Sequence, residues 1–250
     1  MIIDFKDQII LVTGATRGIG KQIADDLHDS GAQLVLTGTK KEVIESLNRE
    51  ANRSKSNRKE YLLADFTDPL STESFLNAVK CYDRIDVCIN NAGINRINYI
   101  DEIRYEDWAD INAVNLSAPL FITREISRIM KKNKYGRIVN ISSIFGSITK
   151  EKRSLYSMSK FGLQGLTIAS ALDLAKYNIL INSVSPGFVH TDLTESILSR
   201  EDIKELAKQV PLGRFATPEE ISKTVMFLAS KHNTYITGQN IIVDGGFVNV

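Results

Sequence analysis

The stretch QIILVTGATRGIGKQIADDLHDSG, residues 8–31, decides the fold that we expect for this chain. It begins as a short β-branched run and ends with the apolar spacing of an amphipathic helix. The turn between them carries Gly14, Gly18 and Gly20 in the spacing GxxxGxG. Glycines at such a turn let the backbone approach a pyrophosphate at the positive end of the helix. The stretch therefore predicts a strand, a dinucleotide-binding turn and a helix, with a tight turn that binds nothing as the alternative.

The same alternation of short apolar runs and helical patterns continues through the rest of the 250 residues. The further strand candidates are AQLVLTG, KEYLLADF, RIDVCINNAG, RIVNISS, ILINSVSPG and NIIVDGG, in this order. Such an alternation is typical of a parallel sheet that helices cover on both faces. We therefore expect an α/β fold: a single Rossmann-like domain over residues 1–250, with a doubly wound parallel sheet of about seven strands.

Composition and charge argue against several classes of protein. The formal net charge is +1, so the chain has no overall field that would attract nucleic acid or an anionic membrane. No segment approaches the roughly 18 apolar residues of a membrane span, and the first residues do not resemble a signal peptide. Cys81 and Cys88 lack metal or redox spacing and are read as reduced thiols. We expect a cytoplasmic protein, with Cys88 and Trp108 in its core.

The end of the second strand candidate indicates which dinucleotide would bind. An acidic residue at this place, about twenty residues after the glycine turn, would bind the ribose 2′-hydroxyl of NAD. Residues 37–41 contain no carboxylate and include Thr39, Lys40 and Lys41. With Arg17, the lysines could bind a 2′-phosphate, so NADP(H) is favoured over NAD(H). An exposed helix start is the alternative explanation of the two lysines.

Polar and small residues follow two more strand candidates. Asp65 could hydrogen-bond an adenine amino group or could finish a turn, and Asp68 with Pro69 is placed to begin a helix. Residues 90–93, NNAG, are small enough for a cofactor and the backbone to come close. Because ligands bind outside the carboxyl ends of the strands in such sheets, we expect these residues at the cofactor site.

The segment YSMSK, residues 156–160, places a phenol and an ammonium four positions apart in a predicted helix. This spacing puts Tyr156 and Lys160 on one face. A phenol titrates near pH 10, so it needs a neighbouring positive charge to work as an acid or base near neutrality. Ser143, at a predicted strand end, could hydrogen-bond a carbonyl oxygen as charge builds on it, whereas Ser142 should face the opposite side. An exposed helical pair is the alternative for Tyr156 and Lys160.

Together and in this order, the motifs resemble the short-chain dehydrogenase/reductase family. They are TGATRGIG, NNAG, Asn115 in INAVNLSAP, Ser143 in RIVNISS, YSMSK, and the PG of SVSPGFVHT. The resemblance runs over nearly the whole chain. Within the family, the chain most resembles the 3-oxoacyl-acyl-carrier-protein reductases and related sugar and polyol dehydrogenases.

The resemblance implies an enzyme that interconverts a carbonyl and a secondary alcohol by hydride transfer. Tyr156 would exchange a proton with the substrate, Lys160 would also bind the nicotinamide ribose, Ser143 would bind the carbonyl oxygen, and Asn115 would hold a proton-relaying water. For Asn115, a polar residue that merely distorts a helix is the alternative. The cofactor-binding residues that we expect are Gly14, Thr16, Arg17, Gly18, Ile19, Gly20, Thr39, Lys40, Asp65, Phe66, Asn91, Ala92, Gly93, Tyr156, Lys160, Pro186, Gly187, Val189 and Thr191.

Residues 188–214 break the strand–helix rhythm, and the family resemblance implies a lid over the substrate. The apolar spacing at Ile197, Leu198, Ile203 and Leu206 predicts an amphipathic helix there. An extra packing helix is the alternative.

The expected substrate is a small carbonyl or alcohol compound, and the sequence leaves two chemical classes open. Lys150, Lys152 and Arg153 could attract an anion or could be exposed loop charges. Tyr177 stands where acyl-carrier reductases usually have an arginine, whereas Lys134 keeps a basic residue at the other docking position. A 3-oxoacyl thioester and a sugar-like or acidic keto compound therefore both remain candidates.

The resemblance also implies a homotetramer, or a homodimer, built through the helices of Asn115 and Tyr156 and the last strand. No nucleic-acid or membrane partner and no metal site is expected. A non-catalytic NADP(H) sensor is the remaining alternative, although a sensor would have no need of Ser143, Tyr156 and Lys160 together.

Overall fold

A computed structural model describes residues 2–53, 58–191, 194 and 199–250. The strands are β1 (Ile9–Val12), β2 (Gln33–Gly38), β3 (Lys59–Leu63), β4 (Val87–Asn90), β5 (Gly136–Ile141), β6 (Ile179–Pro186) and β7 (Asn240–Val243). The helices are α1 (Gly18–Asp29), α2 (Lys41–Arg53), α3 (Pro69–Lys80), α4 (Tyr105–Asn112), α5 (Ala118–Asn133), α6 (Ser154–Leu174), α8 (Arg200–Lys208) and α9 (Pro218–Ala229). A π-helical turn, η2 (Ala113–Ser117), joins α4 to α5, and the shorter 3₁₀ turns are η1 (Ile100–Glu102), η3 (Ile144–Gly146), η4 (Ala175–Tyr177) and η5 (Phe247–Asn249).

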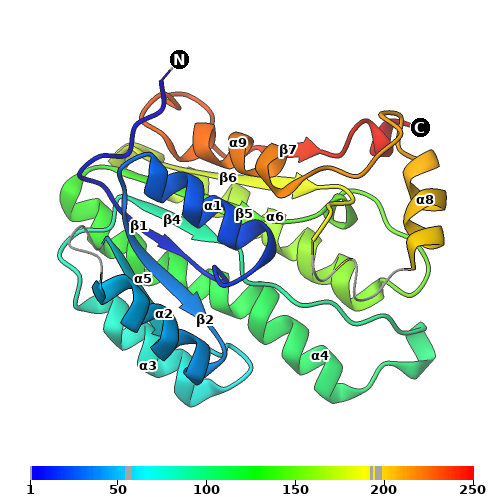
Figure 1. Cartoon of the computed structure of the whole chain (residues 1–250), viewed down its shortest axis with the longest axis horizontal. Coiled ribbons are helices and arrows are strands. Elements are labelled where there is room, and N and C mark those ends of the chain that lie inside the picture. The colour runs from blue at the N-terminus through cyan, green and yellow to red at the C-terminus, as the bar shows by residue number, and fades with distance from the viewer. Residues whose placement is uncertain (1, 54–57, 192–193, 195–198) are drawn as a thin grey trace.

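The strands form one parallel sheet in the order β3-β2-β1-β4-β5-β6-β7 (Figure 1). The expected doubly wound parallel sheet of seven strands is confirmed. β1 pairs with β2 on one side and with β4 on the other, so the chain changes its direction of growth there. Open sheets of this kind bind ligands in the crevice outside the carboxyl ends of the strands at such a reversal.

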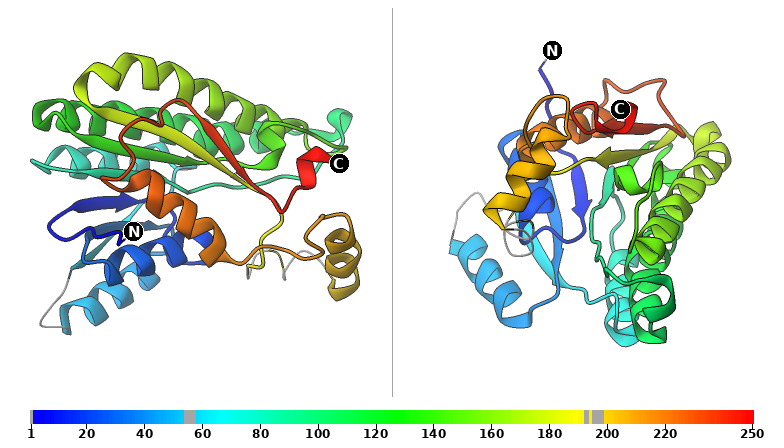
Figure 2. Two further views of the ribbon diagram at one scale, coloured as in Figure 1. Left: turned by 90° about the horizontal axis from the view of Figure 1, so that it is seen from above. Right: turned by 90° about the vertical axis from the view of Figure 1, so that its right-hand side faces the viewer.

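Helices cover both faces of the sheet (Figure 2). On one face α1 and α9 pack together over β1, β2, β5 and β6, and on the other face α3, α5 and α6 pack over the same sheet. The central strands β4 and β5 are buried at every position, as expected for a parallel sheet covered on both faces, whereas the edge strands β3 and β7 are only partly buried. Among the largest fully buried side chains are Ile10 and Ile89 of the two strands that flank the reversal.

Local sequence signals explain several element boundaries. The Asp68 carboxylate accepts hydrogen bonds from the backbone N–H groups of Leu70 and Ser71, and Pro69 is the first residue of α3, as predicted. Ser199 and Asp202 form a reciprocal capping box at the start of α8. Within the predicted lid, Ile197 and Leu198 lie outside the described residues. No helix in the described part of the chain is long and apolar enough to cross a membrane.

The expectation for Trp108 is wrong, whereas that for Cys88 is confirmed. Cys88 is fully buried. Trp108 is 41% exposed and packs against the ring of Tyr105, with 5.2 Å between ring centroids. The inward face of α4 carries Ile111 and Asp107, which is buried because Arg104 and Arg96 pair with its carboxylate. The next residue along a helix turns away from that face, so Trp108 points outward.

Candidate active site

The glycine turn between β1 and α1 has the backbone shape that its sequence predicts. Gly14 and Gly18 have φ angles of 64° and 55°, a left-handed conformation that favours glycine. The Gly14 N–H donates to the Thr37 hydroxyl at 3.0 Å, which ties the turn to β2. A Cβ on Gly20 would collide with the Asn91 amide nitrogen and the Gly14 carbonyl oxygen. The turn therefore packs directly on the segment after β4 and leaves the N-terminus of α1 open to a ligand.

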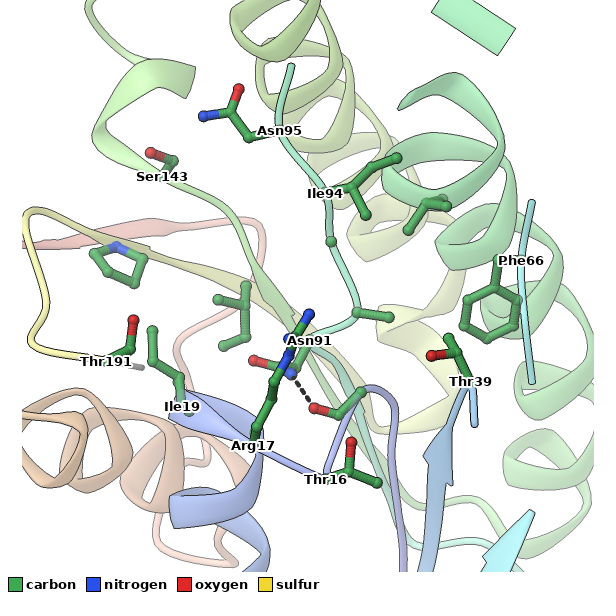
Figure 3. Close-up of a pocket in the computed structure, with 18 of the residues that line it drawn as sticks. Thr16, Arg17, Ile19, Thr39, Phe66, Asn91, Ile94, Asn95, Ser143 and Thr191 are labelled. Atoms are coloured by element: carbon green, nitrogen blue, oxygen red, sulfur yellow. Dashed lines mark hydrogen bonds between the residues drawn. The ribbon is translucent and has the colours of Figure 1, made fainter. Parts of the chain in front are cut away.

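This turn forms one wall of a cavity of roughly 450 Å³ at the carboxyl ends of the strands. Figure 3 shows Arg17, Ile19, Asn91 and Thr191 around it, with Ser143 at the far end. All the predicted cofactor residues line it except Lys40, which is exposed and lies outside the lining. The additional lining residues, which were not predicted, are Thr37, Gly38, Ala64, Thr67, Ile94, Asn95, Val114, Ile141, Ser142 and Thr194.

The cavity fits a nicotinamide dinucleotide. Asn91 holds its floor together, because its side-chain amide donates to the carbonyl oxygens of Thr13 and Gly14 at 3.0 Å each. The Thr13 hydroxyl in turn accepts the N–H groups of Asn91 and Ala92, both at 3.0 Å. These bonds fix a surface of small residues on which a nucleotide can lie without meeting a bulky side chain.

At the adenosine end, Thr39 and Arg17 line the cavity together with Asp65 and Phe66. The Asp65 Oδ1 atom accepts hydrogen bonds from the backbone and hydroxyl of Thr67, at 3.0 and 2.7 Å. Asp65 therefore does finish a turn. Its Oδ2 has no hydrogen-bond partner among the described residues, so the two predicted roles of Asp65 are compatible.

Ser143, Tyr156 and Lys160 meet at the other end of the cavity. Ser143 lies directly after β5 and caps η3, where its hydroxyl accepts the Phe145 N–H at 3.2 Å. Its hydroxyl is also close enough to that of Tyr156 to lower the pKa of Tyr156. The Lys160 ammonium lies 5.6 Å from the centroid of the Tyr156 ring and donates to the Ile141 carbonyl at 2.9 Å. Both α6 side chains thus lie at the nucleotide cavity and on one side of their helix.

Ser142 behaves differently from its neighbour. Its hydroxyl donates to the backbone carbonyl of Lys160 at 3.4 Å, and it lines the cavity as Ser143 does. β5 ends at Ile141, so strict strand alternation no longer applies to the two serines. Of the two hydroxyls, that of Ser143 lowers the pKa of Tyr156.

Burial controls the charge states of the two α6 groups. It raises the pKa of the Tyr156 hydroxyl above its ordinary value of 10, while the Ser143 hydroxyl and the positive charge of Arg153 lower it. Burial also lowers the pKa of the Lys160 ammonium from 10.5 to about 8. The sequence argument did not anticipate the effect of Arg153 on the pKa of Tyr156; it assigned such an effect to Lys160, whose ammonium lies 5.6 Å from the centroid of the Tyr156 ring.

Asn115 lies in the π-helical turn η2, just behind the cavity lining. Its side-chain oxygen accepts the Ile94 N–H, and its amide nitrogen donates to the Ile94 carbonyl, each at 2.9 Å. A Cβ added to Gly93 would lie 3.6 Å from both the Asn115 oxygen and the Lys160 nitrogen, so Asn115 is close to Lys160. The helix is distorted at Asn115, as the alternative reading held, and the residue is also at the site.

Sequence reasoning missed Asn95, although it lies two residues after NNAG. Its Oδ1 atom is buried and has no hydrogen-bond partner among the described residues. Figure 3 shows Asn95 near Ser143, at the end of the cavity away from the glycine turn. The next residue, Arg96, is occupied by ion pairs with Asp107 and Asp110 at 3.3 Å.

Comparisons with known proteins agree with this geometry. A family model described as enoyl-(acyl carrier protein) reductase matches residues 14–248. The 3-oxoacyl-acyl-carrier-protein reductase of Aquifex aeolicus is 38% identical over 98% of this chain and 99% of its own length. That of Escherichia coli is 36% identical over 99% of this chain and 100% of its own length. A structure of a gluconate 5-dehydrogenase from Burkholderia cenocepacia, in complex with NADP and tartrate, has a TM-score of 0.90 at 27% identity and covers 99% of this chain and 98% of that one.

The likeness extends over the whole fold and includes the strand ends that form the cavity. The chain belongs to the short-chain dehydrogenase/reductase family and is an NAD(P)-dependent enzyme that acts on CH–OH and C=O groups.

Proposed function

We propose that this enzyme transfers hydride between NADP(H) and a small carbonyl or secondary alcohol compound, with Tyr156 as the acid and base. The observation that carries the proposal is the meeting of Ser143, Tyr156 and Lys160 at one end of a nucleotide-sized cavity. A purely sensory NADP(H) domain would give no reason for this group.

Each residue of the site would have its own role in the reaction. The nicotinamide nucleotide supplies or accepts the hydride when it is bound. Tyr156 donates its proton to the carbonyl oxygen in reduction and removes it in oxidation. Ser143 donates a hydrogen bond to the same oxygen as negative charge develops on it. Lys160, ionised at neutral pH because its pKa is about 8, stabilises the phenolate that remains and binds the ribose. Asn115 holds the water through which the proton is replaced.

The preference for NADP(H) is supported by the adenosine end of the cavity. Thr39 and Arg17 line it, and no carboxylate is present in residues 37–41. The Arg17 side chain makes no hydrogen bond among the described residues, so its guanidinium is available to a 2′-phosphate. Lys40 is exposed at the edge and could reach the same phosphate from outside. The Burkholderia cenocepacia structure contains NADP.

Two substrate classes have separate support. A 3-oxoacyl thioester is favoured by the identity to the two acyl-carrier-protein reductases. Tyr177 replaces a docking arginine, yet the ammonium groups of Lys131 and Lys176 lie 4.9 and 5.3 Å from the centroid of its ring, so positive charge remains at this position. A sugar acid is favoured by the structural likeness to a gluconate 5-dehydrogenase.

A direct comparison of the two substrates tests the proposal. Turnover of an acetoacetyl thioester with NADPH is measured beside oxidation of gluconate with NADP⁺, for the wild type and Tyr156→Phe. We expect turnover with one of the two and its loss in the variant. Unchanged turnover in Tyr156→Phe would remove Tyr156 from the mechanism.

Assembly and the lid are proposals as well. Exposed apolar side chains on α5 and α6 favour a homotetramer or homodimer. They are Leu120, Phe121, Met158, Phe161, Ile168 and Leu172. Residues 188–214 would close over the substrate, and Thr191 and Thr194 of this segment line the cavity. We place the enzyme in the cytoplasm, as expected for its relatives.

A further inference from the structure

Two of the three guanidinium nitrogens of Arg153 are buried without a hydrogen-bond partner among the described residues, near the proposed proton donor Tyr156. Arg153 directly precedes α6 and lies one helical turn before Tyr156. Its Nε and Nη1 atoms are inaccessible to solvent and have no hydrogen-bond partner among the described residues. A buried N–H group of a charged side chain that bonds to nothing costs free energy. A side chain held in this way is suited to a ligand that supplies the missing acceptors.

A second cation lies nearby, and no anion balances the two. The Arg153 Cζ and the Lys150 Nζ lie 5.6 and 5.8 Å from the centroid of the same ring, that of Phe145. Burial lowers the pKa of both groups, and Arg153 lowers that of Lys150 further. No ion pair in the described part of the chain includes either residue. The pair therefore forms a positively charged, partly desolvated patch.

This patch adjoins Tyr156, which lines the reacting end of the cavity, although neither Arg153 nor Lys150 is itself a lining residue. Phe145 also packs edge-to-face on the Tyr156 ring, with 6.3 Å between centroids, so one aromatic ring contacts Tyr156, Arg153 and Lys150. The charge of Arg153 acts on the Tyr156 hydroxyl. An anion bound to Arg153 would therefore belong to the part of the substrate within a few bonds of its reacting carbon.

The hydrogen-bonding groups at this end also include an unmatched acceptor. The Asn95 Oδ1 is buried and has no partner among the described residues, and Figure 3 shows it on the same side of the cavity as Ser143. An acceptor of this kind suits a hydroxyl group of a ligand. Unmatched cationic donors and an unmatched acceptor near the same reacting end suit a small hydroxylated acid.

We propose that Arg153 determines substrate specificity by binding the carboxylate of a hydroxy or keto acid, while Asn95 accepts a hydrogen bond from a hydroxyl of the same molecule. The proposal rests on the function proposed above and narrows its substrate class. A neutral 3-oxoacyl group would leave the Arg153 donors unmatched, because the phosphate of an acyl-carrier thioester lies many bonds from the reacting carbonyl.

The test compares an acid with its neutral counterpart in Arg153→Gln. Gluconate and glucitol have the same carbon chain and differ at one end in charge, and each is offered with NADP⁺. Wild type should prefer gluconate, and Arg153→Gln should lower kcat/KM for gluconate by about 10- to 100-fold, the range expected for a hydrogen-bonded charge pair. Because Arg153 also lowers the pKa of Tyr156, a loss common to both substrates reports on Tyr156, and the specific effect is read from the ratio of kcat/KM for gluconate to that for glucitol, which should fall by about 10- to 100-fold. The affinity for NADPH should stay within a few-fold. Lys152→Gln, which removes the same charge from the same loop, is the matched control.

Binding gives a readout that does not require turnover. Gluconate should raise the melting temperature of the NADP⁺-loaded wild type and of Lys152→Gln, but not that of Arg153→Gln. Equal responses of the wild type and Arg153→Gln to gluconate would overturn the proposal, and so would an equal loss for gluconate and glucitol. If Tyr156→Phe remained active while Arg153→Gln lost the acid preference, the proposed chemistry would fail and the Arg153 site would stand.

Discussion

Replacing Lys160 by methionine tests how much the buried ammonium of Lys160 lowers the stability of the folded protein. Burial lowers the pKa of Lys160 from 10.5 to about 8, a difference that corresponds to about 3 kcal/mol because one pKa unit is about 1.4 kcal/mol. Methionine has a similar length and no charge, so Lys160→Met removes this cost. It also removes the hydrogen bond to the Ile141 carbonyl, worth about 1.5–3 kcal/mol. At pH 7 we therefore expect the variant to be as stable as the wild type or more stable, by up to about 1.5 kcal/mol.

The change of this stability difference with pH is a stricter test than its value at pH 7. Unfolded Lys160 binds a proton up to about pH 10.5 and folded Lys160 only up to about pH 8. The unfolded state thus binds more protons between these values, so wild-type stability rises with pH there. The burial cost is fully present below pH 8 and disappears toward pH 10.5. Lys160→Met lacks this change, so its stability relative to wild type should fall by about 3 kcal/mol over the interval.

Chemical denaturation of the nucleotide-free proteins at pH 7 and across pH 8–10.5 measures both quantities. An inactive variant whose stability difference from wild type does not vary with pH would refute the argument that the buried ammonium is costly. A variant destabilised by several kcal/mol at pH 7 would do the same, since Lys160 would then be well compensated within the protein.

Three further outcomes follow from the site. Tyr156→Phe should leave the dissociation constant for NADPH within a few-fold and remove nearly all turnover, as measured by titration of NADPH fluorescence and by steady-state assay. Lys40→Glu should weaken NADPH relative to NADH, because it puts a carboxylate beside the expected 2′-phosphate; equal binding of both nucleotides by the wild type would count against that choice. Gly20→Ala should abolish nucleotide binding and lower the free energy of unfolding by about 1–3 kcal/mol, because the added Cβ would overlap Asn91 and the Gly14 carbonyl. Thermal melts with and without NADPH measure both effects. A melting temperature equal to that of the wild type, with the same increase on adding NADPH, would contradict this prediction.

The sheet and the cofactor wall were predictable because they depend on short-range patterns. Strand candidates such as RIVNISS were short runs rich in β-branched residues, and the positions of β5 are buried on both faces, as a covered parallel sheet requires. The glycines at 14, 18 and 20 made the shape of the turn predictable, because a positive φ or a close backbone approach needs glycine. The strand order then brought NNAG and Ser143 to the same edge as that turn.

Features that depend on long-range packing could not be predicted in the same way. Trp108 was expected in the core because of its size, but the ion pairs of Asp107 bury the neighbouring position instead. Arg153 looked like one of three loop charges, and only the fold places its guanidinium near Phe145 and Tyr156. The periodicity of apolar residues in a sequence does not indicate whether a charged side chain will lack a hydrogen-bond partner in the fold.

Deuterium transfer tests the central claim most directly. The protein is mixed with NADPH that carries deuterium at both hydrogen positions of nicotinamide C4 and with the carbonyl compound that it turns over, and mass spectrometry locates deuterium in the product. We predict that the wild type places one deuterium on the new carbinol carbon and that Tyr156→Phe, with the nucleotide bound, places almost none. Transfer at the wild-type rate by Tyr156→Phe, or a product without deuterium at that carbon, would contradict the proposed hydride and proton transfer at this site.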